Sequence, residues 1–261
     1  MNGTQGILAG LVLLANSSHA ESGVFENPRK DCVVLLHGLG RTACSMKRLE
    51  WALQKEDYRV INVSYASTHL SVQDAAAWLD GMLKMQTSDQ VGKVHFVTHS
   101  FGGIVLRQYL TDRKIENLGR VVMLCPPNGG SELADKLRGN ALYKFFTGPS
   151  GQQLGTETFS VPRRLGRADY KLGIIAGDRS LNPVFSAWIP GADDGKVSVA
   201  STQLEGMEDY LVIHHSHTWM PWRKDVSIAV SQFLKCGRFM QNDLFRSGSH
   251  QQQGIVKRMP T

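Results

Sequence analysis

The chain has 261 residues, of which 42% are hydrophobic and 20% are charged, with 26 glycines and 9 prolines. This length fits one large domain or at most two small ones, and the composition excludes a disordered chain, a collagen and a coiled coil. The net charge of +6 raises nucleic acid and anionic lipid as partners. The longest apolar run covers residues 6–15, which is too short to span a bilayer and disfavours an integral membrane protein.

The N-terminal segment has the pattern of a signal peptide. Residues 1–20 contain no charged side chain, and the apolar run is followed by Ser18 and Ala20, which fit a small-x-small cleavage site. We therefore expect residues 1–20 to be removed and the mature chain to begin at Glu21, in the periplasm or outside the cell. Because the segment before the apolar run lacks Lys and Arg, a cytoplasmic protein with a buried N-terminal helix is the alternative.

The predicted elements alternate between strands and helices. Short continuous apolar runs predict strands over residues 32–36, 58–63, 94–97, 120–124, 171–176 and 210–213. Apolar side chains at helical spacing predict helices over residues 45–55, 72–83, 103–110 and 226–234, with Ser71 capping the second. This alternation is typical of βαβ units. It predicts an α/β fold with a mainly parallel sheet of about six strands, flanked by helices on both faces.

The domain predicted over residues 21–238 contains a long connection at residues 131–169. Connections of this length are uncommon unless they are functional, so we expect a small cap or substrate-binding insertion. Its apolar side chains include Leu142, Tyr143, Phe145, Phe146 and Phe159. If they cover a site they favour acyl or lipid substrates, and the alternative is that they pack the insertion onto the sheet.

The strongest chemical signal surrounds Ser100, between a predicted strand and a predicted helix. A serine on such a tight turn projects its hydroxyl off the end of the sheet as a nucleophile, and small neighbours let strand and helix approach. Gly102 and Gly103 meet this need, whereas Thr98 replaces the first glycine of the strict G-x-S-x-G pattern. The alternative is that Ser100 only caps the helix.

A glycine-rich turn at residues 37–40 follows the first predicted strand. It would let the backbone N–H of Leu39 point to the same place as the N–H of Phe101, forming an oxyanion hole. An ordinary strand-to-helix turn is the alternative. No G-x-G-x-x-G motif or Walker lysine supports phosphate binding.

Histidines cluster at residues 214–217, after the last predicted strand. A general base must lie at the end of a strand near the nucleophile, which favours His217, with His215 as the second candidate. Three close histidines invite a metal site, but no acidic partner at helical spacing supports one. We therefore expect neither a metal nor another cofactor.

The acid that orients the histidine has two candidates, Asp194 and Asp178. Each would give the chain order Ser, Asp, His, and each could instead be an ordinary loop acid.

The four cysteines, Cys32, Cys44, Cys125 and Cys236, match no zinc motif. Export would allow one or two disulfides among them, and free buried thiols are the alternative.

Taken together, residues 37–40, 98–103, 193–197 and 217–218 resemble the α/β-hydrolase superfamily, and more closely its bacterial lipase/esterase-type proteins of the lipase and PGAP1-like group. The likeness spans residues 32–235, and residues 126–131 also resemble the loop at that position. It implies Asp194 rather than Asp178 as the acid. The short segment ahead of the first predicted strand departs from the family and suggests a sheet lacking the two leading antiparallel strands.

The resemblance implies a carboxylic ester hydrolase acting through Ser100, Asp194 and His217 on a small-molecule or lipid ester. An acyltransferase with the same triad, or a non-catalytic protein of this fold that binds a partner, are the alternatives.

The basic charge gives little support to a nucleic-acid partner. From residue 236 onward there are four basic side chains and one acidic one, which is half of the total net charge. The rest is too dilute for a nucleic-acid surface, so we expect no such partner. Residues 239–261 are polar and aperiodic, which predicts a disordered basic tail that could contact an anionic membrane. The sequence does not indicate an oligomeric state.

Overall fold

The computed structural model describes residues 29–87 and 91–240. The predicted signal peptide and residues 241–261 of the predicted tail lie outside the described residues. Six strands form one sheet: β1 (Cys32–Leu36), β2 (Arg59–Val63), β3 (Val94–His99), β4 (Leu118–Leu124), β5 (Leu172–Gly177) and β6 (Asp209–Ile213). Their order is β2-β1-β3-β4-β5-β6 and every pairing is parallel. The predicted α/β class and six-stranded parallel sheet are confirmed, and the described residues contain no leading antiparallel strands.

The central strands are buried on both faces, as their unbroken apolar sequences require. Every residue of β1, β3 and β5 is buried. The predicted end of β3 at Val97 was wrong, because Thr98 and His99 still pair with Met123 and Leu124 of β4. The strand therefore carries polar side chains to the carboxyl edge of the sheet, directly before Ser100.

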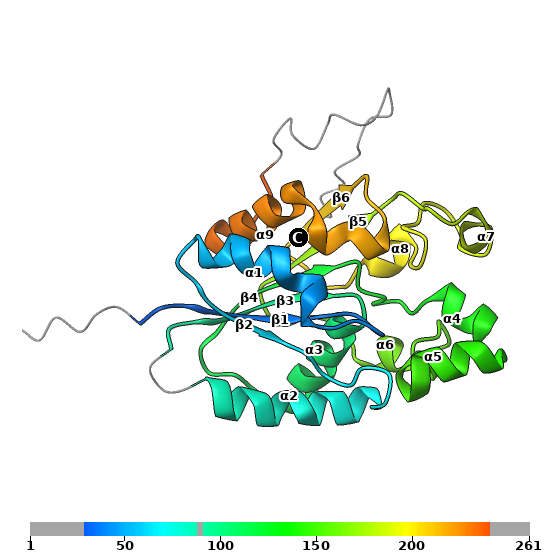
Figure 1. The fold of residues 1–261 in the computed structure, drawn as a ribbon, viewed down its shortest axis with the longest axis horizontal. Coiled ribbons are helices and arrows are strands. Elements are labelled where there is room, and N and C mark those ends of the chain that lie inside the picture. Colours follow the sequence, from blue (N-terminus) through cyan, green and yellow to red (C-terminus); the bar gives the residue numbers. More distant parts are fainter. Residues whose placement is uncertain (1–28, 88–90, 241–261) are drawn as a thin grey trace, which may run out of the picture.

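Helices cover both faces of the sheet, as predicted (Figure 1). A short 3-10 helix η1 (Ala43–Met46), α1 (Lys47–Gln54) and α9 (Lys224–Cys236) pack on one face. The opposite face is covered by α2 (Val72–Gln86) and α3 (Phe101–Asp112). Ser71 caps α2 as predicted, since its Oγ accepts the N–H of Asp74 at 3.1 Å and completes a capping box.

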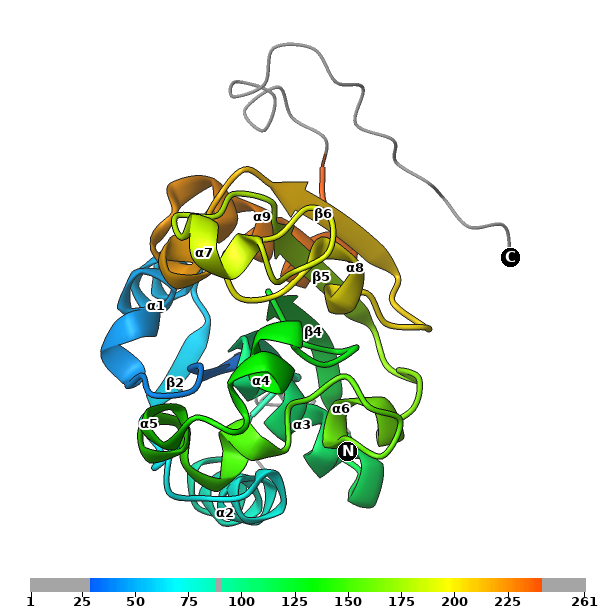
Figure 2. The ribbon, with the colours of Figure 1, turned by 90° about the vertical axis from the view of Figure 1, so that its right-hand side faces the viewer.

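The remaining helices gather at the carboxyl ends of the strands (Figures 1 and 2). The long connection after β4 forms α4 (Glu132–Leu137), α5 (Ala141–Gln152) and α6 (Val161–Arg164). The connection after β5 contains α7 (Pro183–Ser186) and α8 (Val199–Thr202), and η2 (His217–Trp222) follows β6. Residues far apart in the sequence therefore meet at this edge. Within the described residues, no helix is long and apolar enough to cross a membrane.

Helix α5 is fixed to the domain at one end and exposes apolar side chains at the other. It kinks at Gly148 (φ 59°), where a Cβ would lie 1.6 Å from the carbonyl oxygen of Thr68. Just after the kink, Ser150 Oγ donates to the carbonyl of Leu70 at 2.5 Å. Before the kink, Tyr143 packs against the core. The four other side chains named above for this insertion are 63–79% exposed, so they do not pack onto the sheet: Leu142, Phe145, Phe146 and Phe159.

All four cysteines are free thiols. Cys32 and Cys125 are buried, whereas Cys44 and Cys236 are exposed. The disulfides that export would allow are therefore not formed in this structure, and the alternative of buried free thiols holds for two of the four positions.

Candidate active site

Ser100 lies at the sharp turn between β3 and α3 in a strained backbone conformation. Its φ is 53° and its ψ is −121°, a region that residues with a Cβ rarely occupy. Its N–H donates to the carbonyl of Leu124 at 2.8 Å, which fixes the turn to the neighbouring strand. A Cβ at Gly102 would lie 2.6 Å from the carbonyl oxygen of Leu36, so this close approach of helix and strand requires a glycine.

Thr98 fits this turn although the usual pattern has glycine there. Its side chain is fully buried, and a Cβ at Gly103 would lie 3.3 Å from its Oγ1. The missing side chain at Gly103 therefore provides the space that the threonine occupies.

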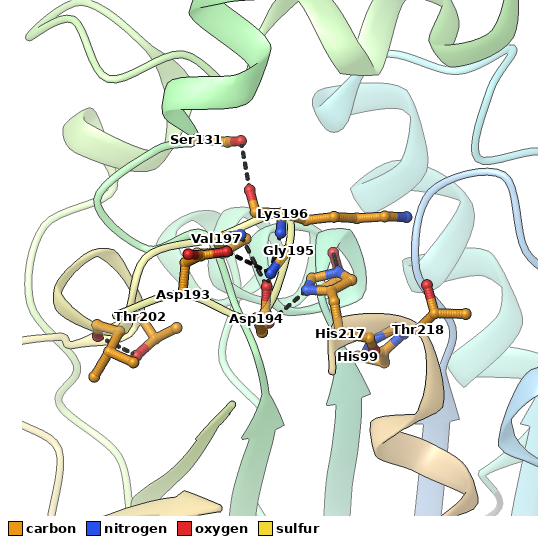
Figure 3. Close-up of polar contacts among 12 residues, drawn as sticks. His99, Ser131, Asp193, Asp194, Gly195, Lys196, Val197, Thr202, His217 and Thr218 are labelled. Atoms are coloured by element: carbon orange, nitrogen blue, oxygen red, sulfur yellow. Dashed lines mark hydrogen bonds and ion pairs between the residues drawn. The ribbon is translucent and has the colours of Figure 1, made fainter. Parts of the chain in front are cut away.

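Ser100, His217 and Asp194 form a chain of hydrogen bonds. His217 Nε2 lies 2.9 Å from Ser100 Oγ, and His217 Nδ1 lies 2.7 Å from Asp194 Oδ2. The histidine and aspartate side chains are only 5% and 0% exposed. Because the carboxylate can only accept, Nδ1 carries a proton and Nε2 is left to accept from the serine hydroxyl. Figure 3 shows the ring of His217 with one edge toward Asp194.

The other predicted candidates are drawn into different pairs. Asp178 Oδ1 lies 2.9 Å from Nδ1 of His214, at the surface. His215 Nε2 lies 2.6 Å from Asp225 Oδ2, at the start of α9. The structure thus brings Asp194, and not Asp178, to His217, and it separates His215 from Ser100.

Several donors hold the Asp194 carboxylate in place. Its Oδ1 accepts the backbone N–H groups of Lys196 at 3.0 Å and Val197 at 2.9 Å, and the Cys125 thiol also hydrogen-bonds to the carboxylate. Burial acts to raise the pKa of Asp194, but the nearby His217 and these hydrogen bonds outweigh it and lower the pKa below its usual value. The group is therefore an anion at neutral pH.

Cys125 was not predicted to belong to the site. It follows β4 with a positive φ of 49° and is fully buried. Burial and the neighbouring Asp194 charge raise the pKa of its thiol well above the usual value, so the thiol keeps its proton and can donate it in a hydrogen bond. Its Sγ, a carboxylate oxygen of Asp194 and a ring nitrogen of His217 lie within 4.8 Å of one another. Three such ligand types could hold a metal, but here the carboxylate is already engaged with the histidine and the thiol.

The loop after β4 fixes the segment that carries Asp194. Gly129 donates its N–H to the carbonyl of Ser201 at 2.7 Å, and Ser201 Oγ donates to the carbonyl of Gly130 at 2.5 Å. Ser131 Oγ donates to the carbonyl of Lys196 at 3.1 Å (Figure 3). These contacts explain why the sequence has a small-residue loop at positions 126–131, next to the acid.

His99 fixes the backbone of His217 and was also missed from the sequence. Its Nε2 donates to the His217 carbonyl at 3.0 Å. Burial and the neighbouring His217 lower the pKa of His99 well below its usual value, so its ring is neutral. Its position beside Ser100 was the one available signal.

The turn at residues 37–40 is held rigidly beside Ser100. The His37 ring accepts the Tyr65 N–H at 3.2 Å through Nε2, which leaves Nδ1 as the donor to the Gly38 carbonyl at 2.9 Å. A Cβ at Gly38 would lie 3.2 Å from Ser100 Cβ, so the turn touches the serine. The N–H of Phe101, the first residue of α3, has no acceptor within its own helix. The structure therefore brings both predicted donor segments, at Leu39 and Phe101, next to Ser100.

The sequence also matches a known protein family. Residues 33–244 match the alpha/beta hydrolase family. The chain belongs to the alpha/beta hydrolase family. A comparison with curated proteins found no match.

Solved structures of this hydrolase fold resemble the chain over most of its length. The mature form of the Bacillus licheniformis lipase BlEst2 superposes with a TM-score of 0.64 at 19% identity, covering 81% of this chain and 93% of that one. The monoacylglycerol lipase of Paleococcus ferrophilus superposes with a TM-score of 0.53 at 16% identity, covering 80% of this chain and 96% of that one. At these identities the likeness concerns the fold.

Proposed function

We propose that the protein is a serine hydrolase that cleaves carboxylic esters through Ser100, His217 and Asp194. The observation that carries the proposal is the chain of two hydrogen bonds, 2.9 Å and 2.7 Å long, that joins these side chains at the carboxyl edge of the sheet. The strained backbone of Ser100 adds support, because such strain is found where a side chain must be presented for chemistry.

The first half of the reaction forms an acyl-enzyme. His217 Nε2 takes the proton of Ser100 Oγ as the oxygen attacks the ester carbonyl, and Asp194 stabilises the resulting imidazolium. The N–H groups of Leu39 and Phe101 stabilise the negative oxygen of the tetrahedral intermediate. His217 then returns the proton to the departing alcohol, which leaves the acyl group on Ser100.

The second half releases the acid. Water gives a proton to His217 and attacks the acyl carbonyl, and collapse of the second intermediate restores the serine hydroxyl. If an alcohol replaces water, the same steps transfer the acyl group, and product analysis in the presence of glycerol separates transfer from hydrolysis.

Two further observations support an ester substrate with an apolar part. The insertion exposes Leu142, Phe145 and Phe146 on α5 to 63–79%, which would suit contact with acyl chains. The two fold relatives named above are lipases.

The decisive experiment compares the wild-type protein with Ser100→Ala. The wild type should be labelled by a fluorophosphonate and should hydrolyse 4-nitrophenyl esters. The variant should lose labelling and about 10³-fold or more of kcat, since the nucleophile is absent while the fold is kept.

A Ser45→Ala variant provides the matched control. Ser45 lies in η1, and its Oγ only donates to the carbonyl of Thr42, the residue before this helix. It should label and hydrolyse as the wild type does. Ester hydrolysis that persists in Ser100→Ala would contradict the proposal, and so would a wild type that neither labels nor hydrolyses any ester.

A further inference from the structure

Two basic side chains flank the three proposed catalytic residues and take no part in the mechanism above. Arg41 follows the glycine-rich turn directly, and its N–H donates to the Gly38 carbonyl at 3.2 Å. Its guanidinium reaches toward the opposite side of the site, where Nη2 makes a long hydrogen bond of 3.4 Å to Oγ1 of Thr218, next to His217. This places a permanent positive charge between the turn at residues 37–40 and His217.

The second cation enters from the loop that carries the acid. The backbone of Lys196 is fixed at both ends, because its N–H donates to Asp194 at 3.0 Å and its carbonyl accepts from Ser131 at 3.1 Å. Figure 3 shows its side chain extending past the ring of His217, away from the Asp194 carboxylate. The ammonium lies close enough to Arg41 for the two charges to repel each other, and both charges act on His99.

Neither cation has a carboxylate partner. Among the described residues, the ion pairs of the molecule include neither Arg41 nor Lys196. Burial, followed by repulsion from Arg41, lowers the pKa of Lys196 below its usual value, and the weaker attraction to Asp194 does not offset this shift. A half-buried cation beside another cation is unfavourable. An anion bound between the two would remove that cost.

We propose that Arg41 and Lys196 bind an anionic group, a phosphate or a carboxylate, carried by the substrate next to its scissile ester. This inference rests on the proposed function and narrows its substrate class. An arginine can bind such a group through two parallel N–H donors, and a lysine adds a mobile point charge. Because Arg41 contacts Thr218 beside His217 and the Lys196 side chain extends past the His217 ring, an anion held by both would lie next to the proposed catalytic residues.

The test uses two pairs of esters, and in each pair one member carries an anionic group that the other lacks. The first pair is monooctanoylglycerol and its 3-phosphate, and the second is 4-nitrophenyl pentanoate and the mono-4-nitrophenyl ester of glutaric acid. The quantity measured is the ratio of kcat/KM for the anionic ester to kcat/KM for the neutral one, below the micelle concentration. The wild type should prefer the anionic member of at least one pair, which also identifies the anion as phosphate or carboxylate.

Substitution should remove the preference. Arg41→Gln and Lys196→Gln should each lower the ratio by about ten- to a hundredfold, the worth of one or two charge-assisted hydrogen bonds. The matched control is Lys144→Gln, which removes an exposed lysine from α5 and should keep the ratio of the wild type. No preference in either pair, or an equal fall for both members of a pair, would overturn the inference.

A binding measurement separates this inference from the proposed chemistry. The ether 1-O-octylglycerol 3-phosphate cannot be hydrolysed, and its affinity for the wild type and the Lys196→Gln and Arg41→Gln variants is measured by calorimetry beside that of 1-O-octylglycerol. Tighter binding of the phosphate that both variants lose supports the anion site even if no ester is cleaved. Equal binding of the two ethers, together with no charge preference in the glutarate pair, overturns it while Ser100-dependent hydrolysis can still stand.

Discussion

Two buried histidines contact aspartates at opposite edges of the same sheet. At the carboxyl edge, His217 and Asp194 are 2.7 Å apart with side chains that are 5% and 0% exposed. At the amino edge, His95 Nε2 lies 3.3 Å from Asp31 Oδ2, and Asp31 is 40% exposed. The two pairs contain the same groups, so the chemistry expected of one and not the other must come from what surrounds them.

The two pairs differ in the group that the second ring nitrogen of the histidine contacts. His95 Nδ1 accepts the backbone N–H of Arg120 at 2.8 Å, so both nitrogens hold the ends of strands together. The second nitrogen of His217 meets a side-chain hydroxyl, that of Ser100, at 2.9 Å. A histidine–aspartate pair is therefore not a catalytic signal by itself, and the third partner decides its role.

The largest contrast is expected from removing the negative charge of each aspartate. Asp194→Asn should lower kcat by about 10³- to 10⁴-fold, because the amide no longer fixes the tautomer of His217 or stabilises its charged form. Asp31→Asn should leave kcat within about twofold of the wild type, since that pair is remote from Ser100. Both are measured on the same 4-nitrophenyl ester.

Asp178→Asn is the matched control at the carboxyl edge, because its carboxylate pairs with the exposed His214. It should behave like the wild type. A larger loss for Asp178→Asn than for Asp194→Asn would reverse the assignment of the acid.

For stability, in contrast to kcat, we expect a large effect from a substitution at the amino edge. His95→Ala removes a buried side chain and leaves the partly buried Arg120 N–H without its acceptor, so it should lower the free energy of unfolding by about 2–3 kcal/mol. It should leave kcat/KM unchanged. Urea unfolding and ester hydrolysis on the same preparation check both halves, and a loss of kcat/KM above about tenfold in soluble, folded His95→Ala would contradict the separation of the two edges.

The fold was predictable because the central strands are buried on both faces. Strands such as β1 and β5 appear in the sequence as short continuous apolar runs between helical segments. The insertion helices gave no such signal. In α5, Leu142, Phe145 and Phe146 face solvent, so their apolar character did not mark a buried face.

The candidate site was predictable where one local motif sufficed. Ser100, with its small neighbours, and His217, in the last loop, both follow strands. The supporting residues were not predictable, because their roles depend on contacts between distant segments. His99 reaches the His217 carbonyl across 118 positions, and Cys125 reaches Asp194 from a different strand end.

The two buried thiols offer a smaller contrast between the edges. Cys125 donates to Asp194, whereas Cys32 begins β1 at the amino edge, where burial raises the pKa of its thiol to about 11. Cys125→Ala should lower kcat by about three- to tenfold, because Asp194 loses one donor and its pKa rises. The acid limb of the pH–kcat/KM profile should shift to higher pH, and Cys125→Ser should return the limb to its wild-type position. Cys32→Ala, the matched control, should leave the profile in place, and a shift there would contradict the assignment.

A pH dependence of stability is expected from both edges of the sheet. Burial is the main cause that lowers the pKa of His95 at the amino edge, and of His37 and His99 at the carboxyl edge. A histidine with a lowered pKa in the folded state takes up its proton first in the unfolded state, so the free energy of unfolding decreases as pH falls below about 6.5. Each such group contributes at most about 1.4 kcal/mol per pH unit.

Urea unfolding between pH 7.5 and 5.5 can show how much of this pH dependence of the free energy of unfolding comes from each edge. His95→Gln and His99→Gln should each lose less stability on acidification than the wild type does, since glutamine does not titrate. The pKa of His99 is lowered further than that of His95, because the ring is fully enclosed and lies beside His217 and near Lys196. The difference between His99→Gln and the wild type should therefore keep growing to a lower pH than the difference for His95→Gln. Slopes equal to that of the wild type in both variants would show that other groups control acid unfolding.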